Sequence, residues 1–194
     1  MTSARTLNTI TLLFDVLFVP AFVEIDTGGA RHLPVFIRKP RCKVFPMKAA
    51  DLHRFNDDSP LETVKDPECP PDGVIVGVKA CGVCRSDHHT WVGAEADLSL
   101  PHVMGHEFAG IVQEVGADCT NFQKGDRVTA PFILGCGHCP DCVGGQPTIC
   151  ESQRLIGFTQ WGAFAERVAV QTADFNLVGL PDSVDYAEAA GMGC

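Results

Sequence analysis

The chain is short of basic residues for its acidic content. Its 194 residues include 15 Lys and Arg against 24 Asp and Glu, and the formal net charge at pH 7 is −9. Proteins that bind the phosphate backbone of nucleic acids carry a basic surface, so the composition argues against a nucleic-acid partner. The hydrophobic content of 45% and the charged content of 20% are typical of a soluble globular protein with one core, with or without an appendage.

The sequence also lacks an apolar run long enough to cross a membrane. The most apolar stretch near the N-terminus, residues 11–25, is interrupted by Asp15 and Pro20, whereas a spanning helix needs roughly 20 apolar residues. Arg5 precedes this stretch as in a secretory signal, but Asp15 lies within it and no clean small-residue cleavage site follows. We therefore expect no membrane partner, and we interpret residues 1–46 as an atypical, poorly ordered N-terminal extension.

Internal repeats and low-complexity tracts are absent, and most of the remaining chain has a β pattern. Short segments rich in β-branched and apolar residues, bounded by Gly, Pro or Asp, occur at 73–80, 108–116, 126–133 and 162–171, and an earlier one begins at Met47. Strands at such intervals predict a barrel or a sandwich instead of alternating strands and helices.

Helical signals are scarce and short. One turn of helix is expected to begin at Ser86 or Asp87, since either side chain is a good cap. A second helix is expected after Pro181, with Asp182 or Ser183 as its cap. Neither segment is long enough to change the prediction of a mainly β fold.

Ten cysteines are many for a chain of this length, and their spacing indicates what they do. Cysteines spread evenly in a secreted protein suggest disulfides, whereas cysteines clustered at short gaps suggest metal binding. Six of the ten fall into two patterned sets, so we expect zinc and a reducing compartment, the cytoplasm.

The first set is C-x2-C-x2-C-x7-C, formed by Cys136, Cys139, Cys142 and Cys150. Zinc in structural sites takes four ligands in a tetrahedron, and here all four are thiolates, which leaves no position for water or substrate. Two local disulfides are an alternative, but such bridges are rare inside cells and adjacent C-x-x-C bridges are usually redox-active. A nucleic-acid-binding zinc ribbon is a second alternative, disfavoured by the acidic composition.

The second set is sparser and of mixed type. Cys84 follows a predicted strand and supplies a thiolate, while His106 precedes the next strand and supplies an imidazole. Two such ligands need a third, with the fourth position left to water or substrate. This arrangement describes a catalytic zinc, for which two cysteines and one histidine are a known ligand set.

The chain resembles the zinc-dependent alcohol dehydrogenases of the medium-chain dehydrogenase/reductase superfamily, from about Met47 to Cys194. The motifs that carry the resemblance are "CGVCRSD", "GHE" with the glycines that follow it to Gly116, "KGDRV", the four-cysteine set and "GFTQWGAFAERVAV". The resemblance implies a mainly β fold with a few short helices, a GroES-like partly open β-barrel with a protruding four-cysteine zinc lobe. It assigns 47–181 to the catalytic domain and 182–194 to the start of a helix leading toward a Rossmann domain.

By the same resemblance, Cys84, His106 and Cys194 hold the catalytic zinc, and the four-cysteine set holds a structural zinc, which makes two zinc ions per chain. In the family a cysteine in a "GC" pair after a short helix is the third ligand, and Gly193-Cys194 matches it. A dinucleotide fingerprint beginning at Gly191 is an alternative, but such a motif must follow a strand. We therefore expect the nucleotide-binding domain for NAD or NADP to lie outside these 194 residues.

The resemblance also implies roles for the residues around this zinc. Ser86 is expected to hydrogen-bond the reacting oxygen and accept its proton, and His89 to relay that proton to solvent. Asp87 is expected to orient the histidine ligand, although capping the short helix is an alternative role. Glu107 is an occasional ligand or a charge that tunes the site, and Arg85 is placed to reach a cofactor pyrophosphate.

The expected function is that of a zinc-dependent, NAD(P)-linked oxidoreductase that acts on the CH–OH group of alcohols. The substrate is a small alcohol or aldehyde. The alternative is an inactive zinc-binding fragment or structural module, because hydride transfer needs a nicotinamide held close to the reacting carbon. Relatives of full length form oligomers, usually through the nucleotide-binding domain, so we expect the 194-residue chain to be a monomer.

Overall fold

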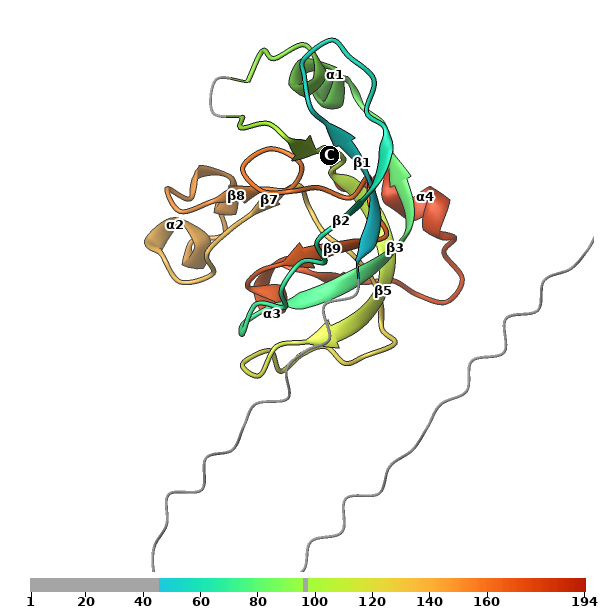
Figure 1. The fold of residues 1–194 in the computed structure, drawn as a ribbon. Coiled ribbons are helices and arrows are strands. Elements are labelled where there is room, and N and C mark those ends of the chain that lie inside the picture. Colours follow the sequence, from blue (N-terminus) through green and yellow to red (C-terminus); the bar gives the residue numbers. More distant parts are fainter. Residues whose placement is uncertain (1–45, 96–97) are drawn as a thin grey trace, which may run out of the picture. The chain divides into compact units, whose positions relative to one another are not determined.

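A computed structural model describes residues 46–95 and 98–194 of the chain (Figure 1). The expected N-terminal extension, residues 1–46, lies outside the described residues except for Pro46. In chain order the elements are β1 (Met47–Leu52), β2 (Leu61–Val64), β3 (Val74–Gly82), α1 (Arg85–Trp91), β4 (His102–Val103), β5 (Glu107–Val115), β6 (Arg127–Thr129), β7 (Ile133–Leu134), α2 (Pro140–Val143), the 3-10 helix η1 (Pro147–Ile149), β8 (Arg154–Leu155), β9 (Arg167–Val170), α3 (Ala173–Asn176), β10 (Val178–Gly179) and α4 (Tyr186–Ala190).

The strands form three antiparallel groups that do not close into a barrel. A five-stranded sheet has the order β10-β6-β5-β3-β9, a three-stranded sheet the order β2-β1-β4, and β7 pairs with β8. Ala50 N donates to Phe164 O at 2.8 Å and ties β1 to the segment before β9. The prediction of a mainly β, partly open arrangement with few short helices is confirmed.

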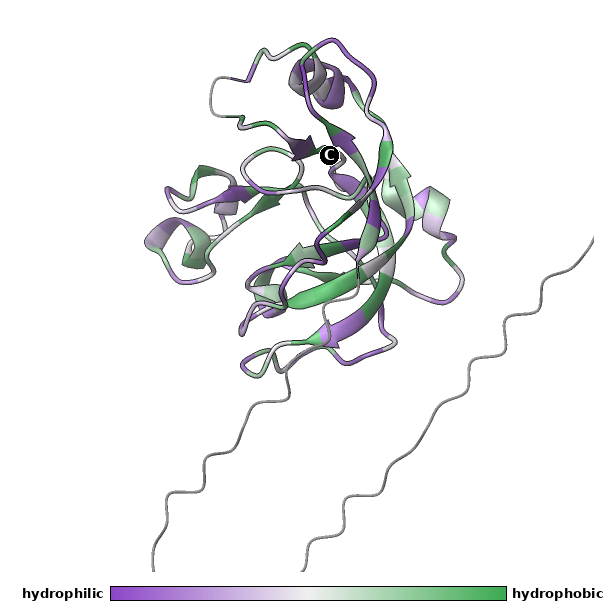
Figure 2. Cartoon of the chain, viewed as in Figure 1, coloured by the Kyte–Doolittle hydropathy of each residue, from purple (hydrophilic) through white to green (hydrophobic). Residues whose placement is uncertain are grey.

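The core is built on β3 and β5, which are the two longest strands described, with nine residues each. Residues 74–77 of β3 are all buried, so both faces of this strand are covered along its first four residues. Figure 2 shows hydrophobic residues along β3 and β9. The largest fully buried apolar side chains are Phe108, Leu52, Leu134, Ile156 and the valines at 74, 76, 103, 112, 128, 168 and 170. Each such side chain contributes about 1.5–3 kcal/mol when removed from water.

Two of the expected strands are shorter than predicted. The segment 126–133 holds two strands, β6 and β7, separated by Pro131, which has no N–H to donate to a ladder. In 162–171 only β9 is a strand, because the preceding residues bond to the chain around Gly105 instead: Ala163 N donates to Gly105 O at 2.8 Å.

The helix starts also differ from the expected ones. α1 is capped by Cys84, and Asp87 occupies the third helical position instead of the cap. α4 is capped by Asp185, whose carboxylate accepts from Ala187 N at 2.8 Å, and not by Asp182 or Ser183. In the described ranges no helix has the length and hydropathy that crossing a membrane requires.

Replacing Phe108 by Ala tests the assignment of the core. The side chain is 0% exposed, so we expect the free energy of unfolding to fall by about 3–5 kcal/mol, measured by urea denaturation. Leu61→Ala is the control, because Leu61 is 70% exposed and its truncation should change stability by less than about 0.5 kcal/mol. Similar effects of the two substitutions would contradict the assigned core.

Candidate metal centres

The lobe formed by β7, α2, η1 and β8 carries the four-cysteine set and lies to one side of the main strands (Figure 1). Cys136 and Cys139 flank a turn, Cys139 caps α2, Cys142 lies on α2, and Cys150 follows η1. The four sulfur atoms all lie within 4.8 Å of one another. Cys136 Sγ is 3.9 Å from Cys142 Sγ, and Cys139 Sγ is 3.8 Å from Cys150 Sγ. The loop therefore brings all four thiols to one point.

These distances fit a tetrahedral metal and not disulfides. Zinc–sulfur bonds of 2.3 Å place tetrahedral ligands about 3.8 Å apart, whereas bonded sulfurs lie about 2.05 Å apart. Backbone N–H groups of His138 and Cys139 stabilise the Cys136 thiolate and lower its pKa to about 6, while burial raises the pKa of Cys142 to about 12. Four adjacent thiolates repel one another, so a cation is needed for all four to be ionised.

The lobe depends on residues that carry no metal-binding group. Gly137 adopts a φ of +78° in the turn between the first two cysteines, a conformation that other residues adopt at a cost. Asn176 of α3 is buried and ties the lobe to the main strands: its Oδ1 accepts from Gly135 N at 2.9 Å, and its Nδ2 donates to Gly135 O at 3.0 Å. Sequence reasoning missed Asn176, which no motif distinguishes.

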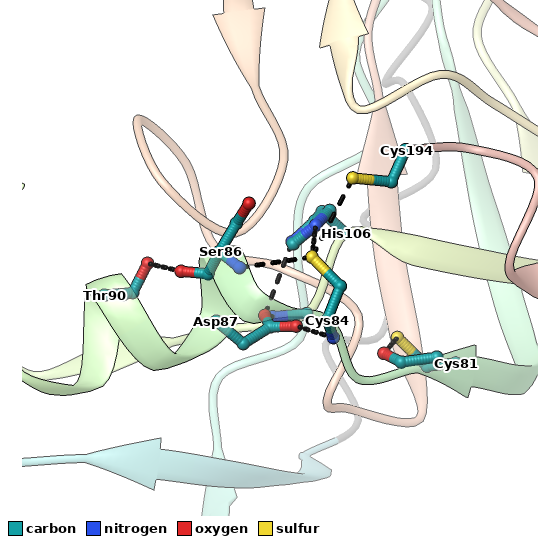
Figure 3. A network of polar contacts seen from close by, with 9 residues as sticks. Cys81, Cys84, Ser86, Asp87, Thr90, His106 and Cys194 are labelled. Carbon is teal, nitrogen blue, oxygen red and sulfur yellow. Dashed lines mark hydrogen bonds and ion pairs between the residues drawn. The ribbon is translucent and has the colours of Figure 1, made fainter.

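The second centre draws its side chains from three distant parts of the chain (Figure 3). Cys84 Sγ lies 3.2 Å from His106 Nε2 and 3.8 Å from Cys194 Sγ. The Glu107 carboxylate completes the group, and the donor atoms of all four residues lie within 4.8 Å of one another. His106 is fully buried and Cys194 is exposed, so the group faces outward on the Cys194 side.

The strand pairing explains why Cys84 and His106 meet. β3 and β5 are antiparallel, and Gly82 at the end of β3 pairs with Glu107 at the start of β5. Cys84 therefore follows one strand and His106 precedes the other at the same end of the sheet. Gly82 leaves room for the acid, since a Cβ there would lie 2.2 Å from Glu107 Oε2.

The α1 N-terminus stabilises the Cys84 thiolate. Ser86 N donates to Cys84 Sγ at 3.2 Å, and Asp87 Oδ2 accepts from Cys84 N at 2.9 Å. Burial raises the pKa of Cys84, but hydrogen bonds from Ser86, then His106 and Cys194, outweigh it, so this pKa lies below its ordinary value. Burial, followed by the contact with Cys84, raises the pKa of Cys194 to about 11. Without a cation, only one of the two thiols ionises readily.

The Asp87 side chain contacts both the N-terminus of α1 and the imidazole of His106. Its carboxylate is 4% exposed. Its Oδ1 accepts from Gly105 N at 3.1 Å and lies 3.3 Å from His106 Nδ1. Burial lowers the pKa of His106. The hydrogen bond and charge of Asp87, and then those of Cys84, raise this pKa by more than burial lowers it, so the net shift is upward. One carboxylate therefore contacts both the N-terminus of α1 and the imidazole of His106.

The other expected site residues lie on α1. Arg85 and His89 are exposed, and Ser86 is half-buried directly after Cys84. The ring of His89 stands 6.4 Å from that of His88. Ser86 and His89 thus lie about one helical turn apart on α1.

Cys194 is positioned by the packing of α4. Ala189 and Ala190 of this helix are buried against Ala109 of β5. Phe132 N donates to Gly193 O at 3.0 Å. A Cβ at position 193 would lie 2.7 Å from Ala130 O, so only glycine allows the chain to approach this closely before the cysteine.

Arg127 of β6 holds the segment that precedes α4. Its guanidinium donates to Pro181 O at 3.0 Å and to Val184 O, and it lies 4.4 Å from the ring centroid of Tyr186. The side chain is 19% exposed. The sequence contained a signal for this residue, the "KGDRV" motif, but the motif indicated no role for it.

Comparison with known proteins identifies a family. The family profile described as "Alcohol dehydrogenase GroES-like domain" matches residues 70–182. An alcohol dehydrogenase of Geobacillus stearothermophilus is 38% identical over 150 residues, which are 76% of this chain and 44% of the relative. An alcohol dehydrogenase of Moraxella sp. (strain TAE123) is 40% identical over 151 residues, with the same coverage. The chain thus spans about 44% of the length of these relatives.

Solved structures agree with this relationship. A cobalt- and zinc-bound thermostable alcohol dehydrogenase from Pyrobaculum aerophilum superposes with a TM-score of 0.70 at 32% identity, covering 77% of this chain and 45% of that one. A putative zinc-binding dehydrogenase from Sinorhizobium meliloti 1021 bound to NADP superposes with a TM-score of 0.65 at 35% identity, covering 75% and 42%.

Arg127→Met tests whether the guanidinium holds α4 in place. The substitution leaves two carbonyls without their donor and removes the contact with Tyr186, so we expect a loss of about 2 kcal/mol in the free energy of unfolding. Hydrogen exchange should accelerate at the amides of α4. Arg54→Met is the control, because Arg54 is 81% exposed in its pair with Asp57 and such pairs contribute about 0–1 kcal/mol. Unchanged exchange in α4 would contradict this role.

Proposed function

The chain belongs to the alcohol dehydrogenase family through its GroES-like domain, and on this premise we propose that it provides the metal-dependent, alcohol-binding part of an NAD(P)-linked dehydrogenase reaction. The reaction oxidises a CH–OH group to an aldehyde or ketone. In this proposal residues 47–181 are the catalytic domain and 182–194 lead toward a nucleotide-binding domain.

The observation that carries the proposal is that one metal-capable group offers four sulfur ligands, whereas the other offers only three strong ligands. The four-cysteine group offers four sulfurs at tetrahedral spacing, which suits a closed structural zinc. The other group offers two sulfurs and one imidazole nitrogen at 3.2 and 3.8 Å, with a carboxylate beside them. A zinc with three protein ligands and an open position is the arrangement of catalytic sites.

The donor chemistry supports zinc at the second group. Cys84 and Cys194 are thiols close enough to repel each other as thiolates, and a divalent cation between them removes that penalty. We propose that Cys84, His106 and Cys194 are the ligands, with Glu107 as an occasional ligand or a nearby charge. A bound zinc supplies Lewis-acid polarisation of the substrate oxygen, and NAD or NADP supplies the hydride acceptor.

The surrounding residues would handle orientation and the proton. Asp87 holds the imidazole of His106 so that Nε2 faces the site. Ser86 is proposed to accept the hydroxyl proton of the alcohol, and the exposed His89 to pass it to solvent, since an imidazole titrates near neutral pH. Arg85, exposed at the start of α1, is proposed to meet a cofactor pyrophosphate.

The proposed setting follows from the same chemistry. Small alcohols or aldehydes are the proposed substrates, and the chain is proposed to be a monomer without nucleic-acid or membrane partners. The cytoplasm is the proposed compartment, because oxidation of the clustered thiols to disulfides would remove the metal ligands.

Cys194→Ser tests the ligand assignment. The unmodified chain should hold two zinc ions, and the variant should hold one, retained by the four-cysteine lobe; elemental analysis after dialysis gives the count. Cys119→Ser is the matched control, since Cys119 bonds to Asp174 outside both groups, and this variant should keep both ions. Two ions retained in Cys194→Ser would contradict the assignment.

Substrate access is tested by replacing the zinc of the second group with cobalt, whose absorption reports the coordination sphere. Addition of a primary alcohol or an aldehyde should shift the cobalt absorption of the unmodified chain and should leave that of Cys194→Ser unchanged. A spectrum that is unaffected by any alcohol or aldehyde would count against the proposed function while leaving the metal assignment in place.

Asp87→Asn tests the orienting carboxylate. The amide removes the negative charge 3.3 Å from His106 Nδ1, so zinc affinity at the second group should fall about 10–100-fold. Competition with a chromophoric chelator measures this affinity. The affinity of the four-cysteine lobe should not change, and equal losses at both sites would point to general destabilisation instead.

A further inference from the structure

A third group of metal-capable side chains lies on the β1–β2 hairpin, whose strands supply no ligand to either cysteine-containing group. Asp51, His53 and Glu62 each offer one donor atom, and the three atoms lie within 4.8 Å of one another. His53 Nε2 is 3.3 Å from Glu62 Oε2 and 3.9 Å from Asp51 Oδ2. Nothing in the proposed dehydrogenase function uses these residues.

The strand pattern explains why they converge. Residues two apart on a strand face the same side, so Asp51 near the end of β1 and His53 just beyond it share a face. In the pairing of β1 with β2, Ala49 lies opposite Glu62, which puts Glu62 on that face, diagonal to Asp51. Asp51 N donates to Pro60 O at 3.1 Å and keeps the two strands together up to this point.

The burial of Asp51 is a second, independent observation that points to a cation. Asp51 is 4% exposed, and its Oδ1 is shielded from solvent without a hydrogen-bond partner among the described residues. A buried carboxylate oxygen without a partner is costly. His53 Nε2 lies 3.9 Å from the other carboxylate oxygen, Oδ2, which is too far for a hydrogen bond, whereas a cation bound by this carboxylate would neutralise its buried charge.

We propose that Asp51, His53 and Glu62 form a site for a divalent transition-metal ion. One imidazole and two carboxylates are a nitrogen and oxygen donor set, which suits zinc, cobalt, nickel or manganese and lacks the thiolates of the other two groups. His53 and Glu62 are 48% and 46% exposed, so water completes the coordination sphere. The site is open, and it binds metal more weakly than the thiolate groups.

The test is a titration of the 194-residue chain, with both cysteine-containing groups already loaded with zinc, by Co²⁺. We expect one further equivalent to bind by calorimetry, with paramagnetic shifts centred on the amides of residues 50–64. Absorption should show no thiolate-to-cobalt charge transfer. These readouts depend on the hairpin alone, so they are interpretable even if the second cysteine-containing group fails to hold zinc.

Two variants and a control decide the outcome. Asp51→Asn and His53→Gln should each weaken Co²⁺ binding by at least about tenfold; the second replaces a half-exposed side chain and leaves the fold intact. Glu151→Gln, at an exposed acid outside the three groups, should bind as the unmodified chain does. No saturable binding, or binding that both variants retain, would show that His53 and Glu62 form a surface ion pair only.

Discussion

Two thiols and an imidazole lie so close together in this chain that both thiols ionise readily only with a cation beside them. Cys84 and Cys194 approach to 3.8 Å, and His106 lies 3.2 Å from the first of them. Packing of the surrounding protein holds these side chains together, because α4 is buried against β5 and the imidazole of His106 is fully buried. Burial, followed by the contact with Cys84, raises the pKa of Cys194 to about 11, while the pKa of Cys84 is lowered, and a divalent ion would allow both to be thiolates.

The scaffold places these groups by long-range contacts and not by local sequence. The antiparallel pairing of β3 and β5 brings Cys84 to His106, and Arg127 fixes the segment that carries α4 and Cys194. Asn176 fixes the four-cysteine lobe in the same way, through its two hydrogen bonds to the backbone of Gly135. In both cases a polar side chain with no metal-binding role, partly buried at Arg127 and fully buried at Asn176, joins a metal-capable segment to the central sheet.

Features that depend on residues close together in the chain could be predicted from the sequence. The C-x2-C-x2-C-x7-C set indicated a closed site because the spacing is local, and the strand at 73–80 was readable because β-branched residues are concentrated in it. The cap of α1 was not readable, since a cysteine is an unusual cap and Asp87 had a competing assignment. The roles of Arg127 and Asn176 arise only from tertiary contacts, and the division of 126–133 by Pro131 depends on which strands pair.

The most direct measurement is ¹¹³Cd NMR of the chain with cadmium in place of zinc, since cadmium accepts the same soft thiolate and imidazole donors and couples to the protons of its ligands. The account predicts two cadmium signals that couple to cysteine protons. One should couple to the β protons of the four lobe cysteines, and the other to those of Cys84 and Cys194 and to the ring protons of His106. A second signal without coupling to Cys194, or a single signal from the lobe alone, would contradict the account.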